Sequence, residues 1–81
     1  MSRIEKVKER FLSCPDDFTW NELVRLLKSF GYEMKSGSGS VRKFRAEGLP
    51  AVNLHEPHPS NVVKRYALRQ VREMLESEGL I

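Results

Sequence analysis

The sequence predicts an α+β domain in which helices pack on one face of a three-stranded antiparallel sheet. Three observations predict it. Two amphipathic helical segments occupy the first third of the chain, three short strand segments separated by turn residues follow, and a long helical segment closes it. With 81 residues, the chain is expected to form one domain, residues 1–81, with a thin hydrophobic core.

The first helix is predicted over about residues 2–13. Ile4, Val7 and Phe11 recur at helical spacing, with charged residues between them. Ser2 is the candidate N-cap. We expect this helix to pack its apolar side against the rest of the domain.

The second helix has the clearest start signal in the chain. Thr19 and Glu22 form a capping box, in which each side chain accepts a hydrogen bond from the backbone amide of the other residue. Gly31 is placed as the C-terminal stop. The predicted apolar stripe consists of Leu23, Val24, Leu26, Leu27 and Phe30.

Three strands are predicted next, at Tyr32 to Ser36, Ser40 to Ala46 and Ala51 to His55. Gly37-Ser38-Gly39 is a flexible turn between the first two, and Glu47 to Pro50 is the turn before the third. Such short spacing indicates an antiparallel meander.

The closing helix is predicted over about Asn61 to Glu78, with Ser60 as its N-cap and Gly79 as its stop. Leu80 is expected to fold back on the helix end. The predicted apolar stripe consists of Val63, Ala67, Val71 and Met74, widened by Tyr66 and Leu75.

Positive charge is unevenly distributed along the chain. The net charge is +3, and two long stretches contain no acidic residue, Met34 to Ala46 and Pro57 to Arg72. Such asymmetry creates a field that attracts polyanions, so a nucleic-acid partner is one interpretation. In the other interpretation, these two stretches form ordinary solvated faces of the domain. The basic residues concerned are Lys35, Arg42, Lys43, Arg45, Lys64, Arg65, Arg69 and Arg72.

Several other classes of protein are disfavoured. The sequence has no apolar run near the roughly 20 residues of a membrane span, and its N-terminus lacks the apolar stretch of a signal peptide. Cys14 is the only cysteine, which fits a reducing cytoplasm. We expect no metal site, because no His, Cys, Asp or Glu cluster has ligand spacing, and no small-molecule cofactor.

Four stretches, in order, resemble the HicA family of toxins, the YcfA-like mRNA interferases of type II toxin–antitoxin systems. They are Trp20 to Tyr32, Gly39-Ser40-Val41-Arg42-Lys43-Phe44, His55 to Asn61, and Leu68 to Val71 with Gly79-Leu80. The resemblance covers about Phe18 to Ile81, so the first helix is extra to it.

The resemblance implies a fold like that of the double-stranded RNA-binding domain. It also implies a metal-independent endoribonuclease that acts on mRNA and is inhibited by a HicB-like antitoxin covering the basic face and the active site. In the family, the histidine after Gly-Ser is taken to be catalytic. This chain has Val41 there, and a valine cannot transfer a proton. Whether the chain is an enzyme therefore stays open.

His55 and His58 are the only histidines, and they are the candidate catalytic residues. RNA cleavage needs a base for the 2′-hydroxyl and an acid for the leaving oxygen, and imidazole serves as either near neutral pH. Both precede the predicted start of the closing helix, where free amides favour a phosphate. In the plainer interpretation, they brace a proline-rich loop or only contact phosphate.

The candidate RNA-binding residues are Lys35, Ser40, Arg42, Lys43, Arg45, Lys64, Arg65, Arg69 and Arg72. We expect the basic residues of the second strand and the closing helix to converge into one continuous surface. Two further interpretations are open: a catalytically degenerate module that binds RNA or antitoxin, and a protein-interaction domain with no role on RNA.

Overall fold

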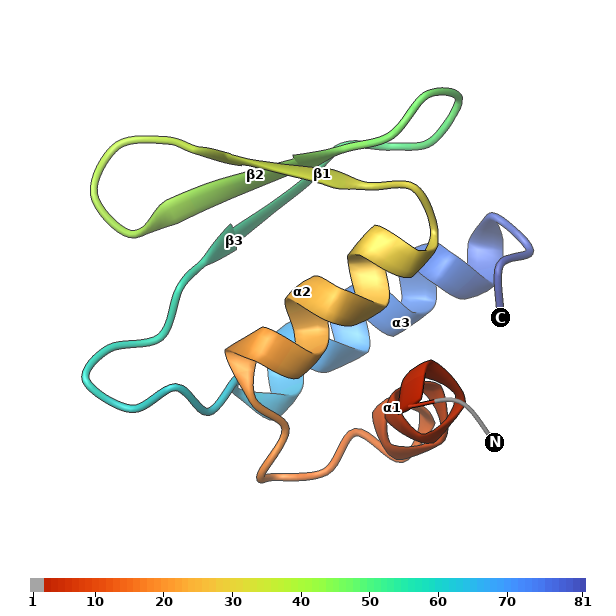
Figure 1. The fold of residues 1–81 in the computed structure, drawn as a ribbon, viewed down its shortest axis with the longest axis horizontal. Coiled ribbons are helices and arrows are strands. Elements are labelled where there is room, and N and C mark those ends of the chain that lie inside the picture. The colour runs from red at the N-terminus through yellow and green to blue at the C-terminus, as the bar shows by residue number, and fades with distance from the viewer. Residues whose placement is uncertain (1–2) are drawn as a thin grey trace.

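The computed structural model describes residues 3–81 (Figure 1). In chain order its elements are α1 (Arg3–Leu12), α2 (Trp20–Ser29), β1 (Glu33–Ser36), β2 (Val41–Arg45), β3 (Val52–His55) and α3 (Arg65–Ser77). The predicted α+β class and element order are confirmed. The predicted N-cap Ser2 lies outside the described residues.

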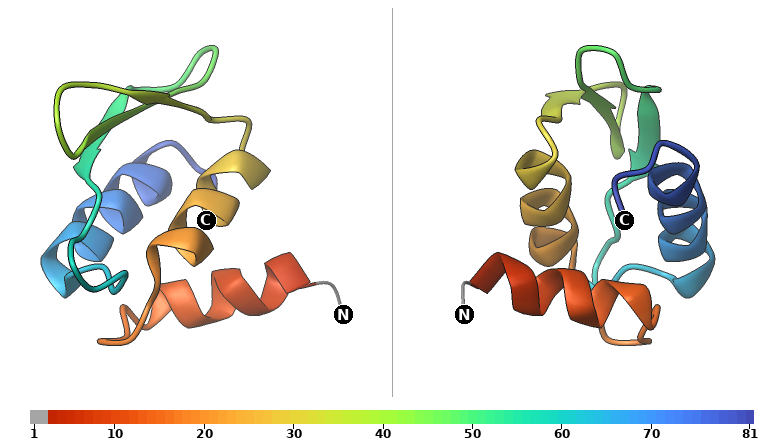
Figure 2. Two further views of the ribbon diagram at one scale, coloured as in Figure 1. Left: turned by 60° about the vertical axis from the view of Figure 1, so that its left-hand side comes forward. Right: turned by 90° about the vertical axis from the view of Figure 1, so that its right-hand side faces the viewer.

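The elements form three layers. The sheet lies on one side of α2 and α3, and α1 crosses these two helices on the side away from the sheet (Figure 2). The side chain of Phe11 on α1 is fully buried, and its ring lies 5.8 Å from that of Phe18. The helix that precedes the family-like region is therefore part of the hydrophobic core.

The sheet is an antiparallel meander with strand order β1-β2-β3, as predicted. Side chains alternate between its two faces. Phe44 points inward, is fully buried, and meets Trp20 edge-on at 5.9 Å between ring centroids. Because Phe44 faces the helices, its neighbours Lys43 and Arg45 point away from them.

The capping box at the start of α2 forms as predicted, with the amide of Glu22 donating to Thr19 Oγ1 and the amide of Thr19 donating to the Glu22 carboxylate. Arg10 on α1 also binds this carboxylate, at 3.0 Å. Burial raises the pKa of Glu22, but these hydrogen bonds outweigh it and leave the pKa below its ordinary value. The start of α2 is thereby joined to α1.

The predicted start of the closing helix is wrong. α3 begins at Arg65, and its N-cap is Lys64 rather than Ser60. Residues 61–63 are instead extended, because they pair with the chain before α2: the Trp20 amide donates to Asn61 O at 2.7 Å and the Val63 amide donates to Phe18 O at 2.8 Å.

The apolar stripe of α3 also differs from the prediction. Of its buried residues, Val71 and Leu75 were predicted and Leu68 was not, whereas Tyr66, which was predicted to widen the stripe, is 61% exposed. At about 100° per residue, Tyr66 lies opposite Leu75 on the helix. The predicted end is confirmed: Gly79 has a φ of +74°, and the Leu80 amide folds back to donate to Leu75 O.

Candidate functional site

A cleft of about 360 Å³ runs along the free edge of β3, between that strand, the loop of residues 56–64 and the first two turns of α3. Apolar side chains, Trp20 among them, form part of its lining. The other residues that line it include Asn53, His55, Glu56, His58, Ser60, Lys64, Tyr66 and Gln70. Both histidines predicted to be catalytic thus lie on one cleft.

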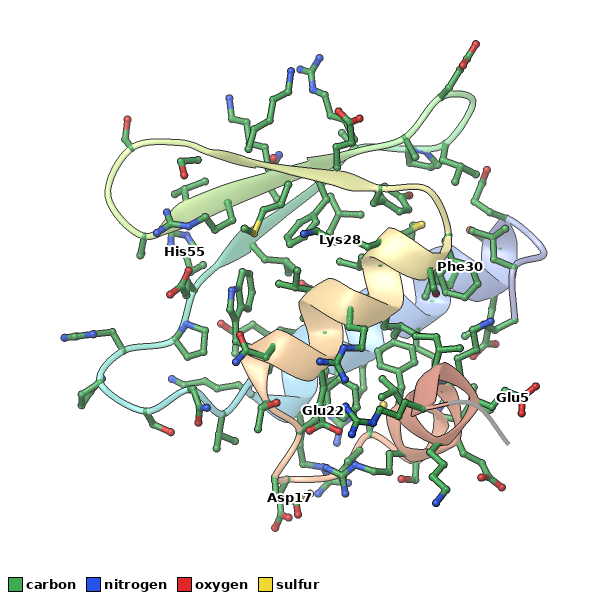
Figure 3. The ribbon with its side chains drawn as sticks, viewed as in Figure 1. Glu5, Asp17, Glu22, Lys28, Phe30 and His55 are labelled. Atoms are coloured by element: carbon green, nitrogen blue, oxygen red, sulfur yellow. The ribbon has the colours of Figure 1, made fainter. Side chains whose placement is uncertain are left out.

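His55 is the last residue of β3, and its exposed side chain lies below the turn between β1 and β2 (Figure 3). Its Nδ1 lies 3.2 Å from Ser40 Oγ, and the Glu56 amide donates to Ser40 O at 2.8 Å. These contacts fix the imidazole beside the turn. They also leave its Nε2 as the ring nitrogen available to a substrate.

Val41 on β2 and His55 on β3 lie directly opposite each other on neighbouring strands, because they are register partners. Directly opposite residues of an antiparallel pair have their Cα atoms about 4.5–5.5 Å apart and their side chains on one face. The sheet therefore places an imidazole next to the position of Val41.

His58 lies in the loop that the pairing of residues 61–63 with residues 18–20 holds in place. Ser60 Oγ accepts a hydrogen bond from the Val62 amide and so shapes this loop. The exposed His58 side chain lines the cleft together with Lys64.

The N-terminus of α3 adds to the positive character of the cleft. No side chain among residues 3–81 caps it, and its first turn contains no acidic residue. Free amides at a helix N-terminus attract anions. Lys64, the N-cap, places an ammonium group at the same end.

Two lysines lie face to face on the outer side of the sheet, because Lys35 on β1 is the register partner of Lys43 on β2. Like charges directly opposite each other destabilise a sheet. Arg45 lies on the same face, across from Glu33. Side chains ending in nitrogen project from the sheet on the side away from the helices in Figure 3. Asn53, the partner of Lys43 on β3, connects this face to the cleft.

Arg42, a predicted RNA-binding residue, is engaged within the domain. Its Nε lies 3.2 Å from a carboxylate oxygen of Glu56, and its Nη1 donates to Gly39 O at 2.9 Å and to Val41 O at 3.0 Å. With its charge paired and two carbonyls bound, Arg42 stabilises the turn between β1 and β2.

Arg65, Arg69 and Arg72 lie together on α3, as predicted, but they face the end of α1. Arg65 Nε donates to Cys14 O at 2.9 Å, and Arg72 Nη1 donates to Leu12 O at 2.8 Å. A hydrogen bond from Arg72 to Glu76 raises the pKa of the guanidinium group. Cations bind well at a helix C-terminus, where carbonyls lack partners.

The expectation of one continuous basic surface is wrong. On α3, Tyr66 and Gln70 line the cleft, whereas the three arginines line the pocket at the end of α1. The cations of the sheet lie on a third face, away from the helices.

Tyr66, Gln70 and Asn53 line the cleft, and sequence reasoning did not select them. The spacing of Leu68, Val71 and Leu75 at i, i+3 and i+7 was the available signal, because it places Tyr66 outside the buried stripe. For Asn53, the signal was its position two residues before His55, on the same face of a strand.

The residues that the structure describes contain neither a candidate metal site nor a helix that could span a membrane. Within residues 3–81, no three His, Cys, Asp or Glu side chains gather in a group that could hold a metal ion. None of the helices in that range has the length and apolar character needed to cross a membrane.

Comparison with known proteins gives one match. Residues 20–77 match the model of a protein family described as the HicA toxin of bacterial toxin–antitoxin systems. No curated protein and no solved structure matches the chain. The matched region contains α2, the whole sheet, the cleft and α3. Because it spans most of the 81 residues, the chain belongs to the HicA toxin family.

Proposed function

We propose that this toxin binds mRNA in the cleft beside β3 and cleaves it as a metal-independent endoribonuclease in the cytoplasm, and that a HicB-like antitoxin inhibits it. The observation that carries the proposal is the placement of His55 and His58 on one cleft, next to the uncapped N-terminus of α3. Family membership supports the role as a toxin of a toxin–antitoxin system.

Cleavage without a metal uses the RNA's own 2′-hydroxyl as the nucleophile. A neutral imidazole takes its proton, the 2′-oxygen forms a bond to the adjacent phosphorus, and the bond to the 5′-oxygen breaks. A protonated imidazole gives that oxygen its proton, so the products are a 2′,3′-cyclic phosphate and a 5′-hydroxyl. Two histidines on one cleft supply both groups.

His55 takes the place of the family's histidine at position 41 in this proposal. Support comes from the register, which puts His55 directly across from Val41 on the same face of the sheet. The hydroxyl oxygen of Ser40, the residue before Val41, lies 3.2 Å from Nδ1 of His55. Nε2 of His55 is then the nitrogen that exchanges a proton with the RNA.

Lys64 and the first amides of α3 bind the phosphate being cleaved or its neighbour, and His58 contacts the same phosphate as the second proton-transfer group. The three features lie on the same cleft or at its α3 end. Charge-assisted hydrogen bonds to phosphate oxygens stabilise the additional negative charge of the transition state.

Replacement of each histidine tests the proposal. We expect His55→Ala and His58→Ala each to slow the cleavage of RNA by about 100- to 10,000-fold, the contribution of one acid or base. Arg69→Ala is the matched control, since Arg69 lies outside the cleft. Unchanged cleavage by a histidine variant would remove that residue from the mechanism.

A restoring variant makes the test of His55 sharper. Val41→His in the His55→Ala background returns an imidazole to the same face of the sheet, one strand away. We expect part of the cleavage activity to return. The same change in the His58→Ala background should restore nothing, because His58 lies in the loop rather than on the sheet.

A catalytically degenerate module that binds RNA or antitoxin is the second candidate function, and Val41 favours it. Expression of the wild type in cells separates the two. An arrest of growth with loss of mRNA is the result expected of the nuclease. Normal growth, together with RNA binding that weakens steeply with salt, is the result expected of the binding module.

A further inference from the structure

Tyr66 is the aromatic residue that the domain leaves open to solvent. Its side chain is 61% exposed, whereas Phe11, Phe18 and Phe44 are fully buried and Trp20 is 6% exposed. Tyr66 is the second residue of α3 and lines the cleft. An exposed ring beside a phosphate-binding end of a helix is suited to stack on a nucleobase.

Residues with amide side chains line two sides of the same cleft. Gln70 is one turn after Tyr66 on α3, and Asn53 lies on β3 at the free edge of the sheet. Both side chains are exposed. An amide group offers two donors and an acceptor, which suits the edge of a nucleobase. The cleft thus combines a ring for the base's face with hydrogen-bonding groups for its edge.

The size and the charges of the cleft match a single nucleotide. Its volume of about 360 Å³ is near the lower limit of about 300 Å³ for small-molecule sites. Lys64 and His58 line it as well and provide contacts for a phosphate. In a duplex, the faces of each base are covered by stacking and its pairing edge by the partner base, so only an unpaired base can use such a site.

We infer that the cleft takes one unpaired nucleotide of single-stranded RNA, with its base stacked on Tyr66 and its edge facing Asn53 and Gln70. This inference rests on the proposed function and names its substrate class. It departs from the duplex binding that the fold's likeness to the double-stranded RNA-binding domain suggests.

Binding to a fluorescent oligonucleotide tests the inference independently of cleavage. The probe is a 2′-fluoro RNA strand that contains one 2-aminopurine, so it lacks the nucleophile and cannot be cleaved. The variants are Tyr66→Phe, which keeps the ring, and Tyr66→Leu, which removes it. Leu12→Ala is the control for loss of an exposed apolar side chain outside the cleft.

We expect the wild type, Tyr66→Phe and Leu12→Ala to bind the strand alike and to quench the 2-aminopurine fluorescence. Tyr66→Leu should bind about 5- to 150-fold more weakly, the effect of losing one stacked base, without quenching. The complementary duplex should bind more weakly than the single strand. Equal affinity for duplex and single strand, or unchanged binding by Tyr66→Leu, would overturn the inference.

The outcome separates this inference from the proposed cleavage. Binding that depends on Tyr66, in a protein that does not cut unmodified RNA, supports the single-strand site and refutes the nuclease. Cleavage that Tyr66→Leu leaves unchanged supports the nuclease and refutes the stacking site. Circular dichroism of Tyr66→Leu should match that of the wild type, because the replaced side chain is exposed.

Discussion

Lys35 and Lys43 on the sheet carry the same charge as Arg65 and Arg72 on α3, but their surroundings differ. The two lysines lie opposite each other on an open face, whereas the two arginines bind the carbonyls of Cys14 and Leu12 at the end of α1. The lysine pair costs stability unless an anion covers it, and the arginines add stability by binding α1. A run of basic residues in a sequence therefore mixes groups that serve folding with groups left for a ligand.

The largest expected effect tests whether α1, to which Arg65 and Arg72 bind, is part of the hydrophobic core. Phe11→Ala removes a fully buried ring from α1, so we expect the free energy of unfolding to fall by about 3–5 kcal/mol. Urea unfolding measures it. A loss below about 1 kcal/mol would show that α1 is not part of the core, and the arginines would then have no structural role to explain them.

Replacing the lysine pair should have opposite effects on binding and stability. In Lys35→Gln/Lys43→Gln, we expect the slope of log affinity against log salt concentration to become less steep. The slope should change by about 1.4 for single-stranded RNA, or about 0.7 for each lost phosphate contact. Relief of the like-charge pair should raise the free energy of unfolding by a few tenths of a kcal/mol. Affinity measured at several salt concentrations and urea unfolding test both effects. An unchanged salt dependence would place RNA elsewhere.

Replacing an arginine of α3 should give the reverse pattern. Arg65→Ala loses a hydrogen bond of 2.9 Å to Cys14 O, which we expect to cost about 1 kcal/mol of stability with RNA affinity unchanged. Arg69→Ala is the matched control, because it removes the same side chain from the same face without a hydrogen bond to the end of α1 among the described residues. Weaker RNA binding by either variant would mean that this face also contacts RNA.

The smallest expected loss of stability concerns pH and the contact between α1 and α2. The folded pKa of Glu22 is below its unfolded value, so its charge stabilises the fold above the unfolded pKa of about 4.3. That stability is lost as the pH falls through the folded pKa. We expect Glu22→Gln to be about 0.5 kcal/mol less stable than the wild type at pH 7. The two proteins should become equal in strong acid, as urea unfolding at each pH would show.

Local signals in the sequence predicted most of the fold. The capping box of Thr19 and Glu22 fixed the start of α2, and turn residues separated the strands. The start of α3 was predicted four residues too early, because the pairing of Asn61 and Val63 with residues 18–20 joins segments far apart in the chain. No local pattern signals a partner at that distance.

The site was predicted only in part, for the same reason. His55 and His58 are close in sequence, so their sharing of a cleft followed from a short loop. Helical spacing placed Arg65, Arg69 and Arg72 on one side of α3, but it could not show that α1 covers that side. Tyr66 was assigned to the apolar stripe of α3 as a residue that widened it, but its side chain is 61% exposed.

Mapping the RNA-contacting surface tests the central claim most directly, namely that RNA uses the cleft and not the arginines beside α1. The measurement is the change in the backbone amide NMR signals of the ¹⁵N-labelled protein on addition of the 2′-fluoro RNA strand. We predict that the shifted signals cluster at His55, His58 and Tyr66, and extend to Lys43. Shifts centred on Ser13, Arg69 and Arg72, with the cleft unchanged, would contradict the account.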